Sequence, residues 1–286
     1  MTLSALLSSV KTAETFLELQ DSTKRSYSLA VSTWIQLMGD SEVSSIDLPT
    51  IDKFKASAKT TKVKRSKDES VLTPSTINIY LRSLKALIGK AVDLKLVDAN
   101  PFTESKLVKV PAKAPAFVTP EEQEKLLEKV SNPRLKRLFI FLFNTGLRSG
   151  EALSLKIENV NLANRTASIV CDSDFTTKTG RSRAVPLNDK ALEALTAQIG
   201  KRTSGKVWDY TLSYASHAFK KSALAAGMGH LHLYNTRHSA ASNLLMKGAS
   251  IASVASLLGH TSINVVMNHY AHLTAAHLQS TVNLLN

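Results

Sequence analysis

One tyrosine near the C-terminus has a setting that suits nucleophilic chemistry. Tyr270 lies ten positions after His260, which ends the segment L-L-G-H at residues 257–260. A tyrosine hydroxyl can form a phosphoester, but its free pKa of about 10 means that nearby cations must help it to attack. In a basic chain, this tyrosine is a candidate nucleophile for covalent cleavage of DNA.

Cations that could assist the tyrosine lie in the same half of the chain. Breaking a phosphodiester without a metal requires a nucleophile, cations on the non-bridging oxygens and a proton donor for the leaving 5′ oxygen. Arg148 and Arg237 are candidate clamps, because a guanidinium donates two parallel hydrogen bonds and keeps its charge. Lys178, in a Thr-Lys-Thr-Gly turn, is a candidate proton donor. Each residue alone also fits an ordinary surface or packing position, so the prediction depends on their combination.

Composition narrows the class of protein. The net charge is +13 over 286 residues, and both halves carry an excess of Lys and Arg, as expected if both contact one polyanion. Cys171 is the one cysteine, so an intrachain disulfide and a cysteine-based metal site are excluded. No apolar run reaches the roughly 18–20 residues of a membrane helix, and the N-terminus lacks a secretory signal pattern. We therefore expect a cytoplasmic protein without membrane association.

The elements that must position these residues fall into two predicted domains. Apolar spacing and capping residues predict helices over about 21–38, from 48 onward and over 73–94, with a polar, basic stretch at 59–70. A segment without clear periodicity follows, and the T-P-E-E capping box at 119–122 opens the next helix. We predict a helical domain at 1–105, an interdomain linker at 106–118 and a larger domain at 119–286.

The larger domain is predicted to mix helices with a small β region. Helical patterns cover about 120–131, 134–144, 150–156, 190–199, 211–226, 234–247, 250–258 and 274–285. Short segments at 160–162, 166–170 and 184–187 predict strands. The predicted fold class is mainly α with a small β-sheet in the second domain.

Four motifs, taken together, match one family. They are T-G-L-R-S-G-E-A-L at 145–153, Y-N-T-R-H at 234–238, L-G-H at 258–260 and Y-A-H at 270–272. In these motifs and in Lys178, the chain resembles the tyrosine recombinases, also called the phage integrase family, over essentially its full length. The resemblance implies a two-domain fold, in which a helical core DNA-binding domain and an α+β catalytic domain with a C-terminal helix form a C-shaped clamp around duplex DNA.

The resemblance also implies a role for each matched residue of a site-specific DNA recombinase or integrase. Tyr270 would attack the scissile phosphate and form a 3′-phosphotyrosyl link, and Lys178 would protonate the leaving 5′ hydroxyl. The residues assigned to stabilising the transition state are Arg148, Arg237 and His260, assisted by Tyr234. Bond energy stays in the covalent link, so no ATP, metal or other cofactor is expected.

Double-stranded DNA is the partner that the resemblance implies. The DNA-binding residues that we predict in the basic stretch and the helix after it are Lys62, Lys64, Arg65, Lys67, Thr73 and Arg82. Strand exchange needs four active sites, so the working unit would be a homo-tetramer on two DNA sites, joined through the C-terminal helix; accessory proteins are compatible with this arrangement. About 20 residues precede the first strong helix, so we expect no extra N-terminal domain for distant arm sites.

One departure from the family pattern concerns the position before the second arginine. Tyr234 stands where the family most often has His, and a tyrosine can donate a hydrogen bond but is not an acid–base group at neutral pH. A register shift could present His230 or His232 instead. We expect His238 to help orient Arg237.

A second departure concerns the spacing from His260 to Tyr270, which is one residue longer than is usual in the family. On a helix, one extra residue rotates a side chain by about 100°. A bulge or loop near Val265 and Val266 would absorb the rotation.

Three alternatives stay open at the level of sequence. A type IB topoisomerase uses the same chemistry on one strand, and a catalytically silent DNA-binding protein would keep the same charge pattern. A zinc site would use the clustered His238, His269 and His272, but carboxylates and cysteines at ligand spacing are missing. The same residues would serve integration, excision, inversion or dimer resolution.

Overall fold

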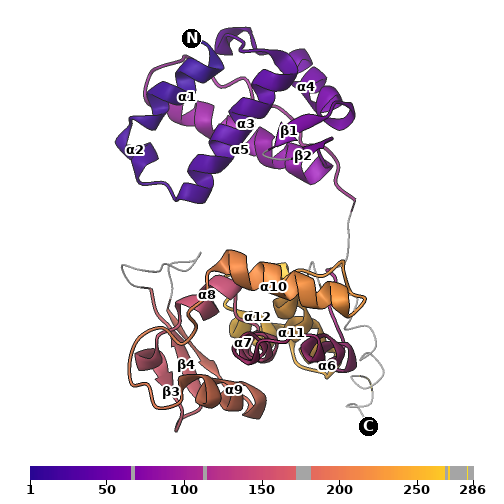
Figure 1. Ribbon diagram of the computed structural model, residues 1–286. Coiled ribbons are helices and arrows are strands. Elements are labelled where there is room, and N and C mark those ends of the chain that lie inside the picture. Colours follow the sequence, from indigo (N-terminus) through magenta and orange to yellow (C-terminus); the bar gives the residue numbers. More distant parts are fainter. Residues whose placement is uncertain (66–67, 112–114, 172–181, 268–269, 271–281, 283–286) are drawn as a thin grey trace. The chain divides into compact units, whose positions relative to one another are not determined.

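The computed structural model describes residues 1–65, 68–111, 115–171, 182–267, 270 and 282. The chain divides into two compact units, Met1–Ala112 and Lys113–Asn286. Both units are mainly helical, and each has a small antiparallel sheet (Figure 1). The predicted fold class is confirmed, although the sheet of the first unit was not expected from the sequence.

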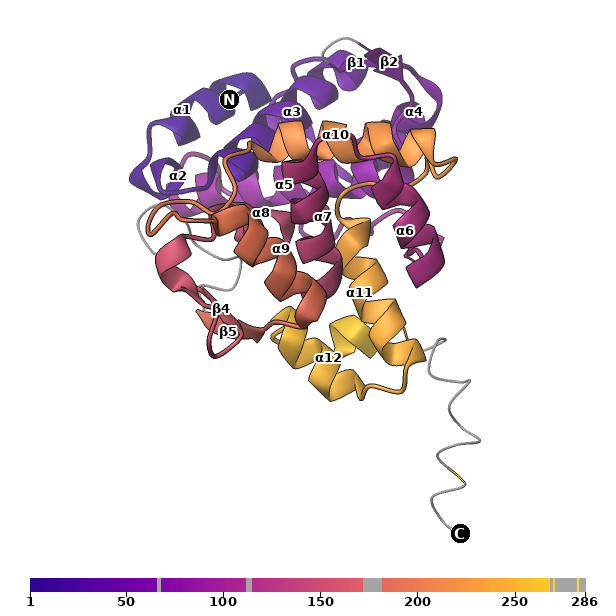
Figure 2. The ribbon, with the colours of Figure 1, turned by 60° about the horizontal axis from the view of Figure 1, so that its bottom comes forward.

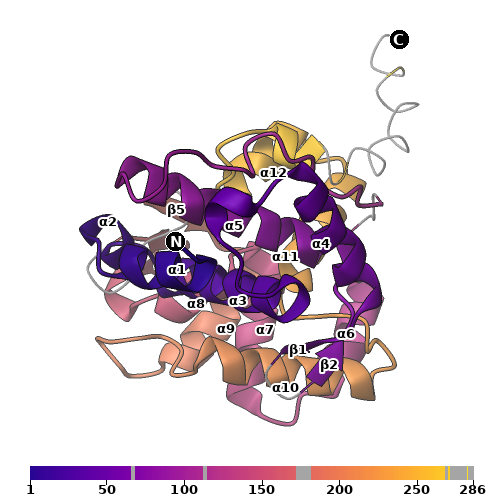
Figure 3. The same cartoon turned by 90° about the horizontal axis from the view of Figure 1, so that it is seen from above.

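The N-terminal unit is a helical bundle built around aromatic side chains. Its helices are α1 (Leu3–Lys11), α2 (Glu14–Leu17), α3 (Asp21–Met38), α4 (Leu48–Thr60) and α5 (Pro74–Asp93), with a short 3-10 helix η1 (Val43–Ser45). Helices α3 and α5 pack against each other (Figure 1 and Figure 3). The Trp34 ring stacks on Phe54 with centroids 4.8 Å apart and meets the edge of Phe102 at 5.5 Å.

Two features of this unit differ from the sequence-based expectation. Helices α1 and α2 were not predicted, because helices this short are marginal in isolation and depend on tertiary packing. In α1 this packing comes from its apolar face, where Leu3, Leu6 and Val10 are fully buried. The basic stretch at 59–70 contains a hairpin, in which β1 (Val63–Arg65) pairs antiparallel with β2 (Asp68–Ser70).

The segment expected as an interdomain linker, 106–118, is held at both of its ends. The side-chain amide of Asn78 on α5 donates to the carbonyl of Val108 and accepts from its N–H, both at 2.8 Å. At the other end, the Val118 N–H donates to Ser239 Oγ at 3.0 Å, and Val118 is 2% exposed. Each end therefore belongs to the packed structure of its own unit, and the boundary at 112/113 lies between the two anchors.

The C-terminal unit carries eleven described elements around a central helix. Its helices are α6 (Pro120–Glu128), α7 (Pro133–Thr145), α8 (Ser149–Ser154), α9 (Asp189–Ile199), α10 (Leu212–Ala225), α11 (Asn235–Met246) and α12 (Ile251–Leu258), with a 3-10 helix η2 (Ile157–Asn159). Strands β3 (Val160–Asn161), β4 (Thr166–Ile169) and β5 (Arg183–Pro186) form an antiparallel sheet in that order. These bounds agree closely with the predicted helices and strands; the helix predicted at 274–285 lies almost wholly outside the described residues.

Helix α7 lies between α9 and α11 (Figure 2). It is apolar over most of its circumference, which is typical of a helix at the centre of a core. Its buried side chains are Leu135, Leu138, Phe139, Phe141, Leu142, Phe143 and Thr145. Since α7 is surrounded by the unit's other helices, the residues just after its C-terminal end are held in a well-defined place.

Helix α7 ends at Gly146, which adopts a left-handed conformation with φ 64°. A Cβ at this position would lie 2.6 Å from Cδ2 of Leu258, the last residue of α12, and Leu258 is only 1% exposed. Glycine thus permits both the turn after α7 and the close approach of α12.

Replacing Gly146 by Ala should lower the free energy of unfolding by about 1–3 kcal/mol, because the substitution adds backbone strain and overpacks the contact with Leu258. Thermal denaturation followed by circular dichroism measures the effect. Gly227→Ala is the control: Gly227 has φ 75°, but a Cβ there would have no neighbour within 4 Å. Equal losses in the two variants would mean that the Leu258 contact contributes nothing.

Candidate active site

Arg148 is placed by the turn that follows α7. After Gly146, the Leu147 side chain is 1% exposed and anchors the turn in the core. Arg148 then takes an extended conformation as the residue that precedes α8, and its side chain retains 21% exposure. The local sequence therefore points the guanidinium away from the core at the start of a helix.

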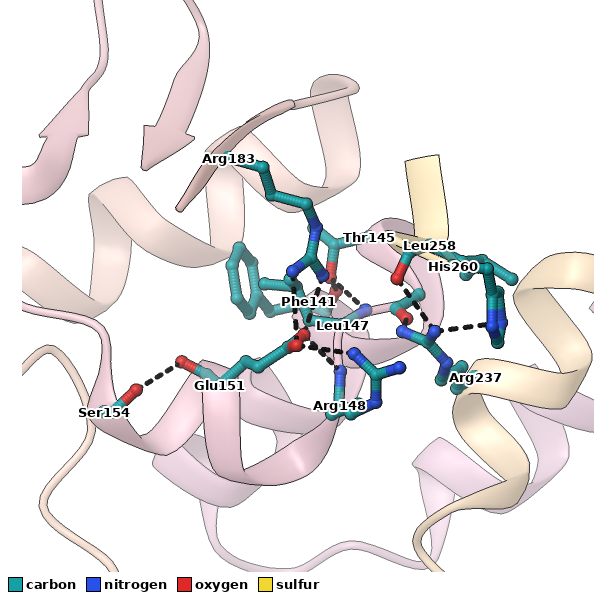
Figure 4. Close-up of polar contacts among 11 residues, drawn as sticks. Phe141, Thr145, Leu147, Arg148, Glu151, Ser154, Arg183, Arg237, Leu258 and His260 are labelled. Atoms are coloured by element: carbon teal, nitrogen blue, oxygen red, sulfur yellow. Dashed lines mark hydrogen bonds and ion pairs between the residues drawn. The ribbon is translucent and has the colours of Figure 1, made fainter. Parts of the chain in front are cut away.

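Glu151 is a buried carboxylate that lies between two arginines (Figure 4). It is 2% exposed and accepts from Nη1 of Arg148 at 2.8 Å and from Nη2 of Arg183, on β5, at 2.7 Å. It also accepts from the Arg148 backbone N–H at 3.0 Å, which satisfies a donor at the start of α8. Burial alone would raise the pKa of Glu151, but the hydrogen bonds and charge of Arg183, with the contacts of Arg148, outweigh it and lower the pKa.

Arg237, on α11, is a buried cation held by backbone carbonyls. It is 2% exposed, and its Nη1 donates to the Gly146 carbonyl at 2.9 Å while its Nη2 donates to the Leu258 carbonyl at 2.8 Å (Figure 4). These carbonyls belong to the C-terminal ends of α7 and α12, where helices carry partial negative charge. Burial, followed by the positive charge of Arg148, lowers the pKa of Arg237 to about 10, so the side chain remains a cation at neutral pH.

His260 follows the glycine turn that ends α12. Gly259 has φ 69°, and a Cβ there would lie 2.7 Å from Nε of Arg183, so the turn packs directly against that arginine. The Nε2 atom of His260 lies 3.1 Å from Nη2 of Arg237 (Figure 4). The neutral ring can accept this hydrogen bond, because a guanidinium has no acceptor atoms. Segments that are far apart in the chain thus meet at Arg148, Arg183 and Arg237, which form the arginine cluster of the site.

Tyr270 lies in a second part of the site, joined to the first through α11. Its hydroxyl is hydrogen-bonded to Nδ1 of His238, the residue after Arg237. The Tyr270 side chain is 4% exposed, and burial, with a smaller contribution from Tyr234, raises its pKa, although Arg237 opposes the shift. In its present environment the phenol therefore stays protonated at neutral pH.

Tyr234 stands beside His238 at the start of α11. Their rings meet edge to face with centroids 5.0 Å apart, and Tyr234 is 47% exposed. Leu231 and Leu233, which precede Tyr234 in the chain, are 0% and 3% exposed. Tyr234 lies one helical turn before His238, in contact with its ring, and the register shift that would present His230 or His232 is not observed.

The structure describes residues 261–267 of the segment between His260 and Tyr270. Residues 264–267 are helical, and Val266 is fully buried, so the described part of this segment contains no bulge near Val265 and Val266. Residues 268–269 lie outside the described part. With this spacing, the hydroxyl of Tyr270 meets His238.

The structure brings together five of the six predicted catalytic residues, and the sixth, Lys178, lies outside the described residues. Glu151 and Arg183 were not among the predicted site residues, and the two form an ion pair. His238 was expected to orient Arg237, and in the structure it is hydrogen-bonded to Tyr270. Glu151 had a local signal, because it lies three positions after Arg148 in the matched motif. Arg183 is 32 positions from Glu151, and no local pattern indicates that contact.

The predicted DNA-binding residues lie in the N-terminal unit. Those whose side chains are described and exposed are Lys62, Lys64, Thr73 and Arg82. Lys64 lies on β1 opposite Glu69 of β2, and its backbone is paired with the Gln36 amide. Thr73 caps α5 by accepting from the Thr76 N–H at 3.3 Å. Arg65 is in β1 and Lys67 lies outside the described residues.

Within the described residues, no group of three or more His, Cys, Asp and Glu side chains is arranged to hold a metal ion. His269 and His272, which the zinc alternative would use, lie outside that part of the chain. None of the helices with described placement is long and apolar enough to cross a membrane.

The part of the chain that forms this site matches a known protein family. The sequence profile of the phage integrase family matches residues 116–277. The chain belongs to the phage integrase family. The match covers the whole arginine cluster, His260 and Tyr270, so the site described above lies in the part of the chain that the family shares.

Relatives of this integrase-family chain include recombinases of bacteria and phages. It is 27% identical over 215 residues to a putative integrase/recombinase of Haemophilus influenzae, covering 70% of this chain and 56% of the relative. It is 28% identical to the shufflon-specific DNA recombinase of Escherichia coli, covering 74% and 54%, and 29% identical to the integrase of Escherichia phage P2, covering 74% and 60%. The chain thus spans little more than half the length of these relatives.

Solved structures of integrases share the fold. The Tn1549 transposon integrase (residues 82–397) in complex with transposon right end DNA superposes with a TM-score of 0.78 at 19% identity, covering 100% of this chain and 99% of that chain. A lambda integrase (75–356) dimer bound to a COC′ core site gives 0.70 at 16% identity, covering 93% and 97%. At these identities the similarity establishes the fold of the integrase-family chain.

Replacing Glu151 by Gln should destabilise the protein by about 3–5 kcal/mol at pH 7, because two arginines would lose a buried counter-charge. Folding lowers the pKa of Glu151 below its ordinary value of 4.5, so the carboxylate stabilises the fold above that pH, and this contribution is lost as the pH falls through the folded pKa. Denaturant unfolding at pH 7 and at stepwise lower pH should show the gap between wild type and Glu151→Gln closing in acid.

Glu124→Gln is the matched control for that experiment. Glu124 is 69% exposed and lies 3.6 Å from Lys190, and exposed pairs of this kind contribute little to stability. The control should therefore resemble wild type at every pH. A loss in Glu151→Gln that does not change with pH would contradict the role of the charge.

Proposed function

We propose that this protein is a tyrosine-type site-specific DNA recombinase that cuts and rejoins duplex DNA through a 3′-phosphotyrosyl intermediate. The observation that carries the proposal is the convergence of Arg148, Arg237, His260 and Tyr270 from separate segments of an integrase-family catalytic unit. Such a site supplies a nucleophile and fixed cations without a metal or nucleotide. The reaction is a pair of transesterifications, in which each phosphodiester that breaks is replaced by another of similar energy.

The arginines provide the electrostatic part of the mechanism. Arg148 uses one terminal nitrogen for Glu151, and its fork can present the other to a phosphate oxygen. Arg237 uses three N–H···acceptor contacts to hold itself in place, and a guanidinium has five donors in all. Donors that are held before the substrate arrives stabilise the charge of the pentavalent transition state without reorganisation. His260 adds a ring nitrogen beside Arg237. Tyr234 adds the hydroxyl of an exposed side chain at the start of α11, which can donate a hydrogen bond to the phosphate.

In the covalent step, Tyr270 is the nucleophile and Lys178 is the proton donor. The Tyr270 oxygen attacks the phosphorus, the bond to the 5′ oxygen breaks, and Lys178 supplies the proton to the leaving hydroxyl. The rise in the pKa of Tyr270 describes the protein without DNA, in which the side chain is buried. A phosphate between Arg148 and Arg237 would bring the reacting atoms together and make the attack effectively unimolecular.

The DNA would be held by both units. In the N-terminal unit, the exposed lysines around the β1–β2 hairpin and Arg82 on α5 are the proposed phosphate contacts. The Tn1549 and lambda integrase structures were determined with DNA, and another lambda integrase structure is a tetramer bound to a Holliday junction. We extend that arrangement to this chain as a homo-tetramer on two sites, joined through residues 274–285 and acting in the cytoplasm.

The decisive test is formation of a covalent complex on a nicked suicide substrate that carries the cognate site. Wild type should give a protein–DNA adduct that survives denaturation, and Tyr270→Phe should give none while binding the same DNA. Tyr214→Phe is the matched control, because Tyr214 is a 52% exposed tyrosine of the same unit on α10, and it should behave as wild type.

Each other outcome of the suicide-substrate experiment has a definite meaning. Specific binding without an adduct in wild type would favour a catalytically silent DNA-binding protein. An adduct together with relaxation of supercoils and no recombinant product would favour a topoisomerase. An adduct that persists in Tyr270→Phe would place the nucleophile elsewhere.

Replacing Lys64 by Ala should weaken DNA binding and reduce its dependence on salt, because one phosphate contact would be lost. The slope of log affinity against log salt concentration should change by about 1. Fluorescence anisotropy titrations at several salt concentrations measure the slope. Lys11→Ala, an exposed lysine at the end of α1 outside the hairpin, should leave it unchanged; equal slopes in all three proteins would remove Lys64 from the DNA interface.

A further inference from the structure

We propose that His238 accepts the proton of the Tyr270 hydroxyl as that oxygen attacks the scissile phosphate, and returns it when the DNA is rejoined. The inference rests on the proposed function, and it assigns the proton acceptor that the mechanism above leaves unnamed. It is carried by the hydrogen bond between Nδ1 of His238 and the Tyr270 hydroxyl.

The geometry places an acid–base group directly on the reacting oxygen. His238 lies on α11, and its ring centroid is 5.9 Å from that of Tyr270 with the planes tilted by 53°. With the proton of the imidazole on Nε2, Nδ1 is an acceptor and the phenol donates to it. A base must lie within hydrogen-bonding reach of the proton that it removes, and His238 meets this condition in the absence of DNA.

The environment of Tyr270 makes an acceptor necessary. Burial raises the pKa of its hydroxyl, and the negative charge of an ionised Tyr234 would raise it further, while Arg237 acts in the opposite direction. A phenol in this setting does not ionise spontaneously at neutral pH, and the neutral hydroxyl is a poor nucleophile. Transfer of the proton within an existing hydrogen bond removes that obstacle during the attack.

The other bases around the arginine cluster are engaged differently. The Glu151 carboxylate accepts from Arg148 and Arg183, and Nε2 of His260 faces Arg237. Tyr234 carries a hydroxyl, which lacks the two ring nitrogens with which an imidazole accepts and passes on a proton. His238 lies four residues later, so both side chains project from the same face of α11, and their rings are in edge-to-face contact. Among the described groups around Tyr270, His238 is therefore the one placed to take the proton.

The step balances in atoms and charge. The Oη–H bond of Tyr270 breaks, its proton moves to Nδ1 of His238, and the oxygen's electron pair forms the new bond to phosphorus. The bond from phosphorus to the 5′ oxygen breaks, and that oxygen takes a proton from Lys178. On rejoining, the 5′ hydroxyl gives its proton back to Lys178, and the imidazolium of His238 protonates the departing tyrosine oxygen.

The test compares His238→Ala and His238→Gln with wild type in single-turnover cleavage of the suicide substrate. Loss of a positioned general base typically costs 10²–10⁴-fold in rate, so both variants should form the adduct about that much more slowly while binding DNA as wild type does. Gln keeps a hydrogen-bond acceptor for the Tyr270 hydroxyl but cannot take its proton. His238→Gln therefore separates proton transfer from positioning, and it also carries the test if His238→Ala fails to fold.

Two further measurements test whether the His238 variants are slow because Tyr270 keeps its proton, rather than because the leaving 5′ oxygen lacks one. A substrate with sulfur in place of the bridging 5′ oxygen has a leaving group that needs no proton, so it should not restore cleavage in the His238 variants, whereas it should restore cleavage in Lys178→Ala. Added imidazole should partly restore His238→Ala, because a free base can occupy the space of the missing ring.

The outcomes separate the inference from the proposed function. Wild-type rates in His238→Gln would reduce His238 to a positioning residue and overturn the inference, and faster cleavage in either variant would show that the hydrogen bond restrains Tyr270 instead. Rescue of a His238 variant by the sulfur substrate would also overturn it. These results leave the wild-type adduct intact, whereas absence of an adduct in wild type on its cognate site would overturn the proposed function and the inference together.

Discussion

Burial of one guanidinium between the ends of two helices is the interaction on which the rest of the catalytic unit depends. Arg237 donates to the carbonyls of Gly146 and Leu258, which close α7 and α12, and so satisfies acceptors that the helices themselves leave open. Removing a cation from water is costly, and the cost is offset only where good acceptors surround it. The same contacts hold the turn that presents Arg148 and the turn that presents His260. An arginine on a third helix thereby aligns two segments that carry chemistry.

The arginine cluster carries more positive than negative charge before any DNA is bound. Glu151 faces Arg148 and Arg183, while Arg237 is held by neutral carbonyls and a histidine. One carboxylate therefore orders two arginines without neutralising the cluster. Such a site attracts a phosphate and gains most when negative charge increases in the transition state. The lowered pKa of Arg237 shows the same repulsion among cations, in addition to the effect of burial.

Much of the secondary structure could be predicted because its signals are local. The capping box at Thr119 and the asparagine caps of α7 and α9 mark helix starts within a few residues. Helices α1 and α2 and the β1–β2 hairpin escaped prediction because elements this short are stabilised by contacts with distant parts of the chain. The fully buried face of α1 and the pairing of Gln36 with Lys64 are contacts of that kind.

The amino-acid sequence determined which residue types were available for phosphoryl chemistry, since four short motifs indicate Arg148, Arg237, His260 and Tyr270 by neighbours along the chain. It also placed a tyrosine at position 234, three residues before Arg237. Tertiary structure alone decided which side chains share hydrogen bonds. Arg183 pairs with Glu151 across 32 positions, and Tyr270 pairs with His238 across another 32. Such contacts depend on how α7, α11 and α12 pack, and helix packing is a property of the whole core that no local pattern records.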